Sequence, residues 1–406
     1  MATTLVCVAG AVRAAAVSLV GILIAIHLAS EGLTPVSIGF VIGCGIAGNA
    51  LATILTGMWG DRIGRRRTQA IVGVVSGAGY IGVAHVAGVV PLMGIAFYGL
   101  VNGMGRDRGP ASALDQAILP SLTTDEQRTW VLAWYNASVD AGHALGALAA
   151  AIPTIAVRMF ATDIATARAA TFTACGVVLM VASLPYALLP GAVESAAGNS
   201  GRAGAPVDLE TRSVVRRIAL LFGMDSVGAG FLNASLIAYW FFERYGTSEA
   251  QLAALFFAAR TLNVVSHVGA AWLARRIGLL NTMVFTHLPS SVLLMLAPAA
   301  PSAGVAAALF LAREALVEMD VPTRQSYVMA VVPPAARTYT SGMTNVARNA
   351  GWVVGPLIAG TVMQRLALAG PLFIGGVLKI AYDLLLYRSF RHVRPPEETP
   401  RVIVPA

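Results

Sequence analysis

The chain has 406 residues, of which 57% are hydrophobic and only 12% carry a charge. Soluble domains carry about 25% charged residues, so a water-soluble globular protein and a disordered chain are both excluded. The formal net charge is +8, and Lys379 is the only lysine, so the positive charge is almost entirely arginine. The arginines lie in short gaps between apolar runs, which indicates a membrane protein and no nucleic-acid partner.

Twelve apolar runs follow one another along the chain, each close to the 20 or so residues that a transmembrane helix needs. We expect helices because lipid offers backbone groups no hydrogen-bond partners, and runs of this length do not suit barrel strands. The predicted spans are 4–29, 37–58, 70–90, 92–113, 129–153, 168–189, 215–241, 250–273, 282–299, 303–325, 339–363 and 371–388. The predicted fold is therefore an all-α polytopic membrane protein with twelve transmembrane helices.

The arginines also predict the orientation of the chain. Arg62, Arg65 and Arg66 follow the second span, and two more arginines follow the eighth. The alternate gaps, such as 29–37 and 243–249, carry little positive charge. Because positively charged loops stay in the cytoplasm, we expect both termini there and a multi-pass protein of the inner (plasma) membrane.

A stretch rich in Gly, Ser, Ala and Pro divides the chain in the middle. Residues 191–214 have too little apolar content to span, and we interpret them as a flexible cytoplasmic linker. The predicted domains are a six-helix bundle at 1–190, a second at 215–390, and a cytoplasmic tail at 391–406.

The two halves share short sequence patterns. Three patterns recur in the same order, at Arg128 and Arg337, at Arg62 and Arg276, and at Pro110 and Pro322. The separation along the chain is nearly the same for all three. Matches at nearly one offset indicate duplication of a six-helix unit, which is the expected plan of one large class of transporters.

The gap between the second and third spans carries the most specific motif. Gly57-Met-Trp-Gly-Asp61-Arg62-Ile-Gly64-Arg65-Arg66 matches the pattern G-x-x-x-[DN]-[RK]-x-G-R-[RK] at every defined position. With this motif and the repeat, the chain resembles the major facilitator superfamily over essentially its whole length. The resemblance implies two pseudo-symmetric six-helix bundles that work by alternating access. It also implies that this loop latches the cytoplasmic side in the outward-facing state.

The resemblance further implies a partner for the signature arginine, and the matching acid at the end of the fourth span is Asp115. The second copy of the motif is degenerate, so a complete latch is expected only in the first half. The alternative is an ordinary positive loop. A glycine motif of family antiporters has a near match only in the eleventh span, whereas the fifth span has Gly142 and Gly146. Tight helix packing is the favoured interpretation of these glycines.

Ionisable residues inside the spans are costly and therefore mark candidate functional sites. Three arginines of the first half correspond, at one common offset, to three acids of the second: Arg13 to Asp225, Arg106 to Glu318, and Arg108 to Asp320. The hypothesis is that these pairs line the substrate cavity and gate it, forming in one access state and breaking in the other. The alternative is neutralisation within each half, for example by Asp107 in the first half and by Arg313 or Arg324 in the second.

Polar residues also follow one face of three spans at helical spacing. They are Asn136, Asp140 and His143 in the fifth span, Arg260, Asn263 and His267 in the eighth, and Asn345, Arg348 and Asn349 in the eleventh. By the resemblance these spans meet between the bundles, so the stripes form inter-bundle seams or reach the cavity. Asp140 with His143, and Glu314 in the tenth span, are candidates for proton coupling; packing or local ion pairing is the alternative.

The motifs of enzymes are absent: we find no HExxH, GxSxG, GxGD or P-loop pattern. The histidines are scattered and the three cysteines lack CxxC spacing, so neither a metal nor a cofactor is expected. A duplicated plan favours alternating access over a channel. The predicted function is secondary active transport of a small organic solute by proton-coupled efflux, with protons and membrane lipids as further partners. The alternative is an organic-anion transporter that uses Arg13, Arg106, Arg108 and Arg260.

Overall fold

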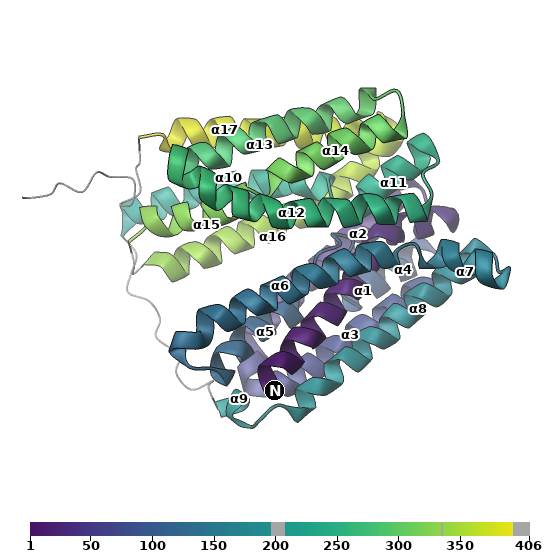
Figure 1. Cartoon of the computed structure of the whole chain (residues 1–406), viewed down its shortest axis with the longest axis horizontal. Coiled ribbons are helices and arrows are strands. Elements are labelled where there is room, and N and C mark those ends of the chain that lie inside the picture. Colours follow the sequence, from purple (N-terminus) through teal and green to yellow (C-terminus); the bar gives the residue numbers. More distant parts are fainter. Residues whose placement is uncertain (196–207, 334–335, 393–406) are drawn as a thin grey trace, which may run out of the picture. The chain divides into compact units, whose positions relative to one another are not determined.

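The computed structural model describes residues 1–195, 208–333 and 336–392. Much of the predicted linker and tail therefore lies outside the described residues. The helices are α1 (Ala2–Ser30), α2 (Pro35–Ile63), α3 (Arg65–His85), α4 (Val89–Tyr98), α5 (Pro110–Ile118), α6 (Asp125–Ala149), α7 (Ile152–Phe160), α8 (Ile164–Ser183), α9 (Ala192–Ser195), α10 (Leu209–Phe231), α11 (Ala234–Tyr245), α12 (Glu249–Ile277), α13 (Leu279–Leu296), α14 (Ala303–Val317), α15 (Asp320–Val331), α16 (Arg337–Arg365) and α17 (Gly370–Phe390) (Figure 1).

These helices form the twelve predicted spans within the described part of the chain. Eight spans are single helices, and four consist of two helices each: α4 with α5, α6 with α7, α10 with α11, and α14 with α15. Eight helical stretches there are long and apolar enough to cross a membrane by length and composition alone. Large apolar side chains such as Val90, Leu145 and Val265 are more than half exposed, as lipid-facing residues should be.

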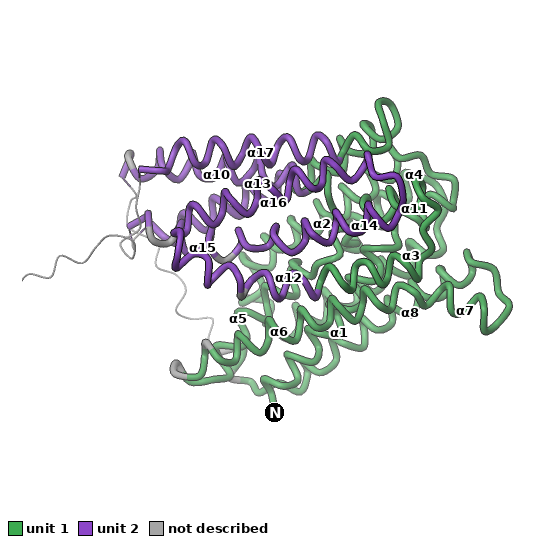
Figure 2. Tube along the Cα trace, turned by 45° about the horizontal axis from the view of Figure 1, so that its top comes forward, with its two compact units in different colours: residues 1–202, 230–260, 352–371 green, residues 203–229, 261–351, 372–406 purple. Residues whose placement is uncertain are grey.

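The chain forms two compact units (Figure 2). Unit 1 comprises residues 1–202, 230–260 and 352–371, and unit 2 comprises 203–229, 261–351 and 372–406. In unit 1, α1 packs against α6, α8 and α11, and α3 packs against α8. In unit 2, α13 packs against α14 and α15. Unit 1 thus joins the first six spans to segments of the seventh, eighth and eleventh.

The same junction follows the second span and the eighth. Gly64 joins α2 to α3 with φ +99°, and Gly278 joins α12 to α13 with φ +88°. Only glycine adopts this region without strain. The hydroxyls of Thr68 and Thr282 each donate to the carbonyl of the preceding glycine, at 2.9 and 2.8 Å. Because these junctions occupy matching positions of the sequence repeat, they are structural evidence of the duplication.

The fourth span differs from the prediction of one helix over 92–113. Helix α4 ends at Tyr98 and α5 begins only at Pro110, so residues 99–109 form a non-helical break. This break contains four glycines and precedes a proline, a composition that disfavours helix. Within it, Leu100 and Gly105 adopt positive φ angles of 52° and 67°.

Backbone without helical hydrogen bonds needs other partners inside a membrane protein, and side chains supply them at the break. The carbonyls of Leu100, Gly103, Gly105 and Arg106 accept from the side chains of Asn49, Ser235, Arg260 and Asn102, at 2.8, 3.0, 3.0 and 2.8 Å. The N–H of Asp107 donates to Nε2 of His143 at 2.8 Å. The break is therefore a specifically bonded structure.

Candidate functional site

A buried ion cluster lies in unit 1 around Arg13, in the first half of α1. The guanidinium binds Asp107 from the break through Nε at 2.7 Å, and Asp115 from α5 through Nη2 at 2.6 Å. Arg13 is 9% exposed and Asp115 is fully buried. In this structure the charge of Arg13 is thus neutralised by acids of the first six spans. This is the alternative to a pair with Asp225 that the sequence left open. A pair with Asp225 stays a prediction for another access state.

Asp115 is the most densely bonded carboxylate of this cluster. Besides Arg13, it accepts hydrogen bonds from Gln69 Nε2 at 2.7 Å, Tyr135 Oη at 2.9 Å and Tyr186 Oη at 2.5 Å. Four donors from four different spans explain why a fully buried carboxylate is tolerated here. The partner expected for it from the family resemblance was the signature arginine Arg65, which here has other partners.

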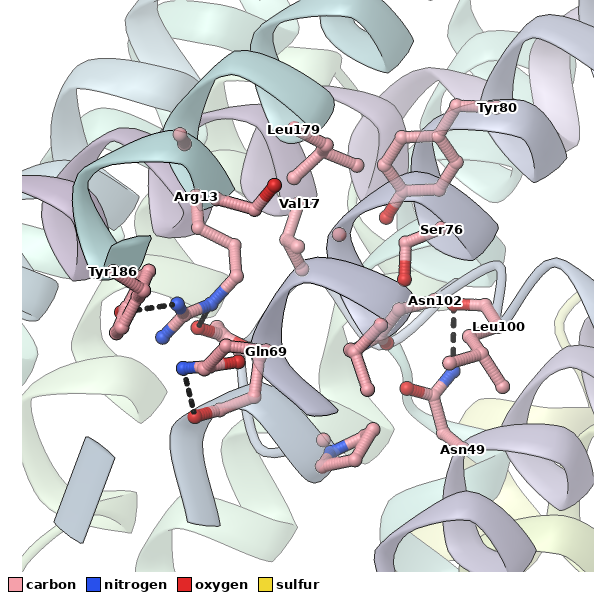
Figure 3. A pocket seen from close by; sticks show the side chains of 18 residues that line it. Arg13, Val17, Asn49, Gln69, Ser76, Tyr80, Leu100, Asn102, Leu179 and Tyr186 are labelled. Atoms are coloured by element: carbon pink, nitrogen blue, oxygen red, sulfur yellow. Dashed lines mark hydrogen bonds and ion pairs between the residues drawn. The ribbon is translucent and has the colours of Figure 1, made fainter. Parts of the chain in front are cut away.

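A pocket lies beside Arg13, between α1, α2, α3, α8 and the break in the fourth span (Figure 3). The protein atoms leave about 520 Å³ empty there, part of it continuous with solvent. Figure 3 shows Arg13 and Tyr186 on one side of this space and Ser76, Tyr80 and Asn102 on the other. Because the fourth span is not helical at this level, it leaves room inside the first six spans.

The signature loop is held by bonds within unit 1. Across the junction at Gly64, Arg65 Nε pairs with Asp61 Oδ1 at 2.7 Å, and its Nη1 donates to the carbonyl of Ala117 at 2.9 Å. Gly57, Asp61 and Arg62 lie along the last two turns of α2, where these residues are exposed. The exposed side chains of Asp61 and Arg62 leave this end of α2 accessible to further partners.

Glu194, on the short helix α9 after the sixth span, is a residue that sequence reasoning missed. Its carboxylate accepts the backbone N–H groups of Arg65 at 2.6 Å and Arg66 at 3.2 Å, and the Nε of Arg66 at 3.2 Å. These backbone donors lie at the N-terminus of α3, where a negative charge is stabilising. Glu194 lies in the stretch 191–214 that the sequence predicts to be a flexible linker, whose start is instead a short helix bonded to α3, so only an isolated acid marked it.

Basic residues surround the break in the fourth span. Arg106 and Arg108 lie within it, and Arg260 on α12 donates to the carbonyl of Gly105 at 3.0 Å. The guanidinium of Arg108 lies 5.8 Å from the ring centroid of Trp352 on α16, a cation–π distance. The break thus brings together residues from the fourth, eighth and eleventh spans within unit 1.

Unit 2 contains a second buried ion cluster, centred on Asp225 of α10. Asp225 pairs with Lys379 Nζ at 2.7 Å and with Arg324 Nη1 at 3.2 Å, and Arg324 also pairs with Asp320 at 2.7 Å. All four residues are at most 5% exposed. Sequence reasoning missed Lys379 as a partner, although a single lysine inside a predicted span is itself an unusual signal.

A titratable pair extends this second cluster. His287 Nδ1 lies 3.0 Å from the carboxylate of Asp383, and His287 Nε2 lies 3.4 Å from Lys379 Nζ. His287 and Asp383 are both 1% exposed. The chain Asp383–His287–Lys379–Asp225 therefore links four ionisable groups of α10, α13 and α17. The sequence gives no signal for this pair, because its two members lie 96 residues apart in the chain.

The two clusters are inverted in charge. Arg13 and Asp225 occupy matching positions in the sequence repeat. The first is a cation between two carboxylates and the second is a carboxylate between two cations. Each half thus has a buried charge at the matching position of the sequence repeat, and residues of the same half neutralise that charge.

The other candidate residues from the sequence, those for proton coupling and those of the polar stripes, differ in their burial and in their partners. Asp140 lies 3.8 Å from His143 and its side chain is 46% exposed, while Glu314 pairs with the adjacent Arg313. His267 lies 3.6 Å from Glu318, at the end of α14. Buried residue Asn263 has no hydrogen-bond partner for either amide atom within the described part of the chain. The other stripe residues are exposed, as are Asn136 and Asn345, or half-buried, as are Arg348 and Asn349.

One further ion pair joins the first six spans to the eighth. Arg168 on α8 pairs with Glu249, the first residue of α12, and they are 4% and 3% exposed. Arg168 also donates to Ser30 Oγ at 2.9 Å, and Thr154 Oγ1 donates to Glu249 at 3.1 Å. Ser30 ends α1, so this four-residue group, the lock, lies at the opposite end of α1 from the N-terminus.

Two repeated six-span halves with ionisable residues buried inside the spans are typical of secondary transporters. The model of the Major Facilitator Superfamily matches residues 6–356. The chain belongs to this superfamily, which confirms the predicted fold class and identifies a transporter rather than an enzyme.

Individual relatives are distant. An uncharacterised membrane protein of Saccharomyces cerevisiae, YJR124C, is 23% identical over 397 residues, covering 90% of this chain and 88% of its own. The crystal structure of the nucleoside transporter NupG is similar with a TM-score of 0.72 at 13% identity, covering 96% of this chain and 98% of its own. A D-xylose-proton symporter has a TM-score of 0.70 at 15% identity, covering 95% and 96%. At these identities the structures show the shared fold alone.

Proposed function

We propose that this chain is a proton-coupled secondary transporter that exports a small organic solute across the plasma membrane by alternating access. The inverted charge clusters around Arg13 and Asp225 carry this proposal. Buried charges are costly in a membrane and are kept where ions or solutes pass. In each half the charge is satisfied by its own partners, and a change of partner would accompany a change of access state.

The group Asp383–His287–Lys379–Asp225 is the proposed proton carrier. It contains two carboxylates and a histidine that are nearly inaccessible, in contact with a lysine. Moving one proton to or from it would change the net charge of a buried cluster, which biases a two-state bundle strongly. Asp140 with His143 stays the second candidate and Glu314 the third.

The gating part of the proposal concerns both ends of the bundle. We place the signature loop and both termini in the cytoplasm, following the positive-inside rule. The loop from Gly57 to Arg66 then acts as the cytoplasmic latch, and the lock around Arg168 and Glu249 closes the opposite end. The pairs Arg13–Asp225, Arg106–Glu318 and Arg108–Asp320 are proposed for the access state in which the halves exchange partners.

Proton flux in proteoliposomes tests the proposal. The lumen holds a pH-sensitive dye, a library of small organic solutes is added outside, and solute-dependent lumenal pH changes are recorded. We expect Asp225→Asn to abolish the change and Asp225→Glu to retain it. Asp163→Asn, at the exposed start of α8, is the matched control and should behave as the parent.

Each outcome has a definite meaning. Saturable counterflow of a solute without any proton movement would refute the coupling and leave a facilitator. Flux that does not saturate with solute would refute the carrier mechanism. Gel filtration of each variant separates a loss of coupling from a loss of folding.

Organic-anion transport is the second candidate function. Arg106, Arg108 and Arg260 gather at the break in the fourth span, next to the ring of Trp352. Guanidinium groups bind carboxylates and phosphates well, and an aromatic ring suits an organic body. This candidate predicts that acidic solutes in the library drive counterflow and that Arg260→Gln weakens it, whereas Arg276→Gln at the end of α12 does not.

A further inference from the structure

We propose that the pocket beside Arg13 is a binding site for a small organic cation, such as a protonated amine. The pocket lies wholly inside unit 1 and is lined by the first four spans and the sixth. The proposal does not depend on the transport cycle, because binding is measured on the purified protein.

The balance of charge around the pocket favours a cation. Its lining includes one cation, Arg13, and one acid, Asp107. Arg13 is also bound by Asp115, so the cluster has two carboxylates for one guanidinium. His143 accepts the N–H of Asp107 through Nε2, so its ring is not doubly protonated and adds no positive charge. Among the lining residues and the groups bonded to Arg13, the carboxylates thus outnumber the guanidinium by one; Arg106, Arg108 and Arg260 lie around the same break but do not line the pocket.

The excess charge is accessible at Asp107 and not at Asp115. Asp115 is fully buried, does not line the pocket and accepts four donors. Asp107 lines the pocket and uses Oδ2 for Arg13, while no donor to its Oδ1 is found among the described residues. That oxygen is the natural acceptor for an ammonium group.

The walls of the pocket suit the organic part of such a ligand. Val17, Leu100 and Leu179 supply apolar surface, and Tyr80 and Tyr186 supply rings. Aromatic faces attract cations, and the effect is larger in a site away from water. An anion would be repelled by the Asp107 carboxylate, and a ligand without a donor would leave its Oδ1 without a hydrogen bond. Together these features select a compact amine with a hydrophobic body.

Three probes that share one benzene ring test the charge preference. Benzylamine is a cation at neutral pH, benzyl alcohol is neutral and benzoate is an anion. We expect benzylamine to raise the Tm of the purified full-length protein and to bind in isothermal titration, and the other two to bind at least about tenfold more weakly. Equal binding of all three, or tighter binding of benzoate, would overturn the proposal.

Variants then locate the binding. Asp107→Asn keeps the shape of the side chain and leaves Arg13 with one carboxylate, so we expect it to fold and to lose the preference for benzylamine over benzyl alcohol. Asp107→Glu should retain that preference. Ser76→Phe fills the pocket and should abolish binding, whereas Val74→Phe lies on the exposed face of the same helix and should not.

Two results of the variant series would place the cation elsewhere and refute the pocket as its site. The first is unchanged benzylamine affinity in both Asp107→Asn and Ser76→Phe. The second is equal loss in Ser76→Phe and Val74→Phe, which would indicate a general disturbance of α3. If Asp107→Asn does not fold, the comparison of Ser76→Phe with Val74→Phe still decides.

Discussion

The lock between Arg168 and Glu249 predicts a specific shift between access states. Glu249→Gln keeps the shape of the side chain and removes its charge, so the guanidinium of Arg168 stays buried with Ser30 and neutral groups. Removing one partner of a buried ion pair costs about 3–5 kcal/mol. Because glutamine still accepts a hydrogen bond, we expect about 3 kcal/mol, the lower end of this range.

This cost applies only while the lock is buried. When that end of unit 1 opens, water reaches Arg168 and the penalty disappears, so the ratio of open to closed molecules rises. With about 1.4 kcal/mol for each factor of ten, the shift is about 10²-fold. The population of a minor open state would therefore become readily measurable.

Cysteine labelling measures that population. Ala25 on α1 is fully buried and α1 packs against α11, so Ala25→Cys, in a chain whose three natural cysteines are replaced, reports opening through its rate of reaction with a maleimide. We expect Glu249→Gln to raise that rate strongly. Glu243→Gln, the same substitution at an exposed position of α11, is the matched control.

A second substitution makes the reasoning refutable. Adding Arg168→Gln to Glu249→Gln removes the stranded charge, so the labelling rate should return most of the way to that of the parent. If the single variant folds and labels like the parent, the lock does not hold this end closed. If the double variant labels faster than the single one, the unpaired charge is not the cause.

Two further perturbations test the packing of unit 1. A Cβ at Gly142 would collide with the backbone of Ala11, so we expect Gly142→Val to prevent folding. Gly57 has open space around it, so Gly57→Val should give a normal gel-filtration profile. Equal yields of folded protein from the two variants would contradict the tight packing at Gly142. Asp115→Asn removes the negative charge to which four side chains donate. We therefore expect the free energy of unfolding to fall by about 3–5 kcal/mol and the Tm to fall by several degrees. An unchanged Tm would show that Asp107 alone is enough to stabilise the charge of Arg13.

Hydropathy was sufficient to predict the spans. Runs of about 20 apolar residues have few folded alternatives in lipid, so twelve helices followed directly. The repeated pattern at Arg62 and Arg276 was used only as evidence of duplication, although the glycine two residues after each arginine ends a helix with a positive φ angle. The break in the fourth span was predictable in principle from its four glycines, but its apolar flanks suggested one continuous helix.

The partners of the buried charges could not be predicted in the same way. The repeat identified Arg13 and Asp225, but a linear pattern does not specify how each helix is rotated about its axis or which neighbours it meets. Asp115 therefore binds Arg13 and not the arginine of the signature loop, and His287 finds Asp383 on α17. Glu194 lay in a short segment with no periodicity at all.

The hydrogen bonds at the break in the fourth span imply that water enters when the neighbouring spans separate from it. Two of its carbonyls, those of Gly103 and Gly105, are satisfied by Ser235 and Arg260, which belong to the seventh and eighth spans. If these spans move away, both carbonyls must find new donors inside the membrane-spanning region, and water is the available one. Separation of the seventh and eighth spans from the break is then accompanied by the uptake of water molecules that bind these two carbonyls. Its equilibrium should consequently respond to osmotic stress, and solutes that lower water activity should favour the closed form.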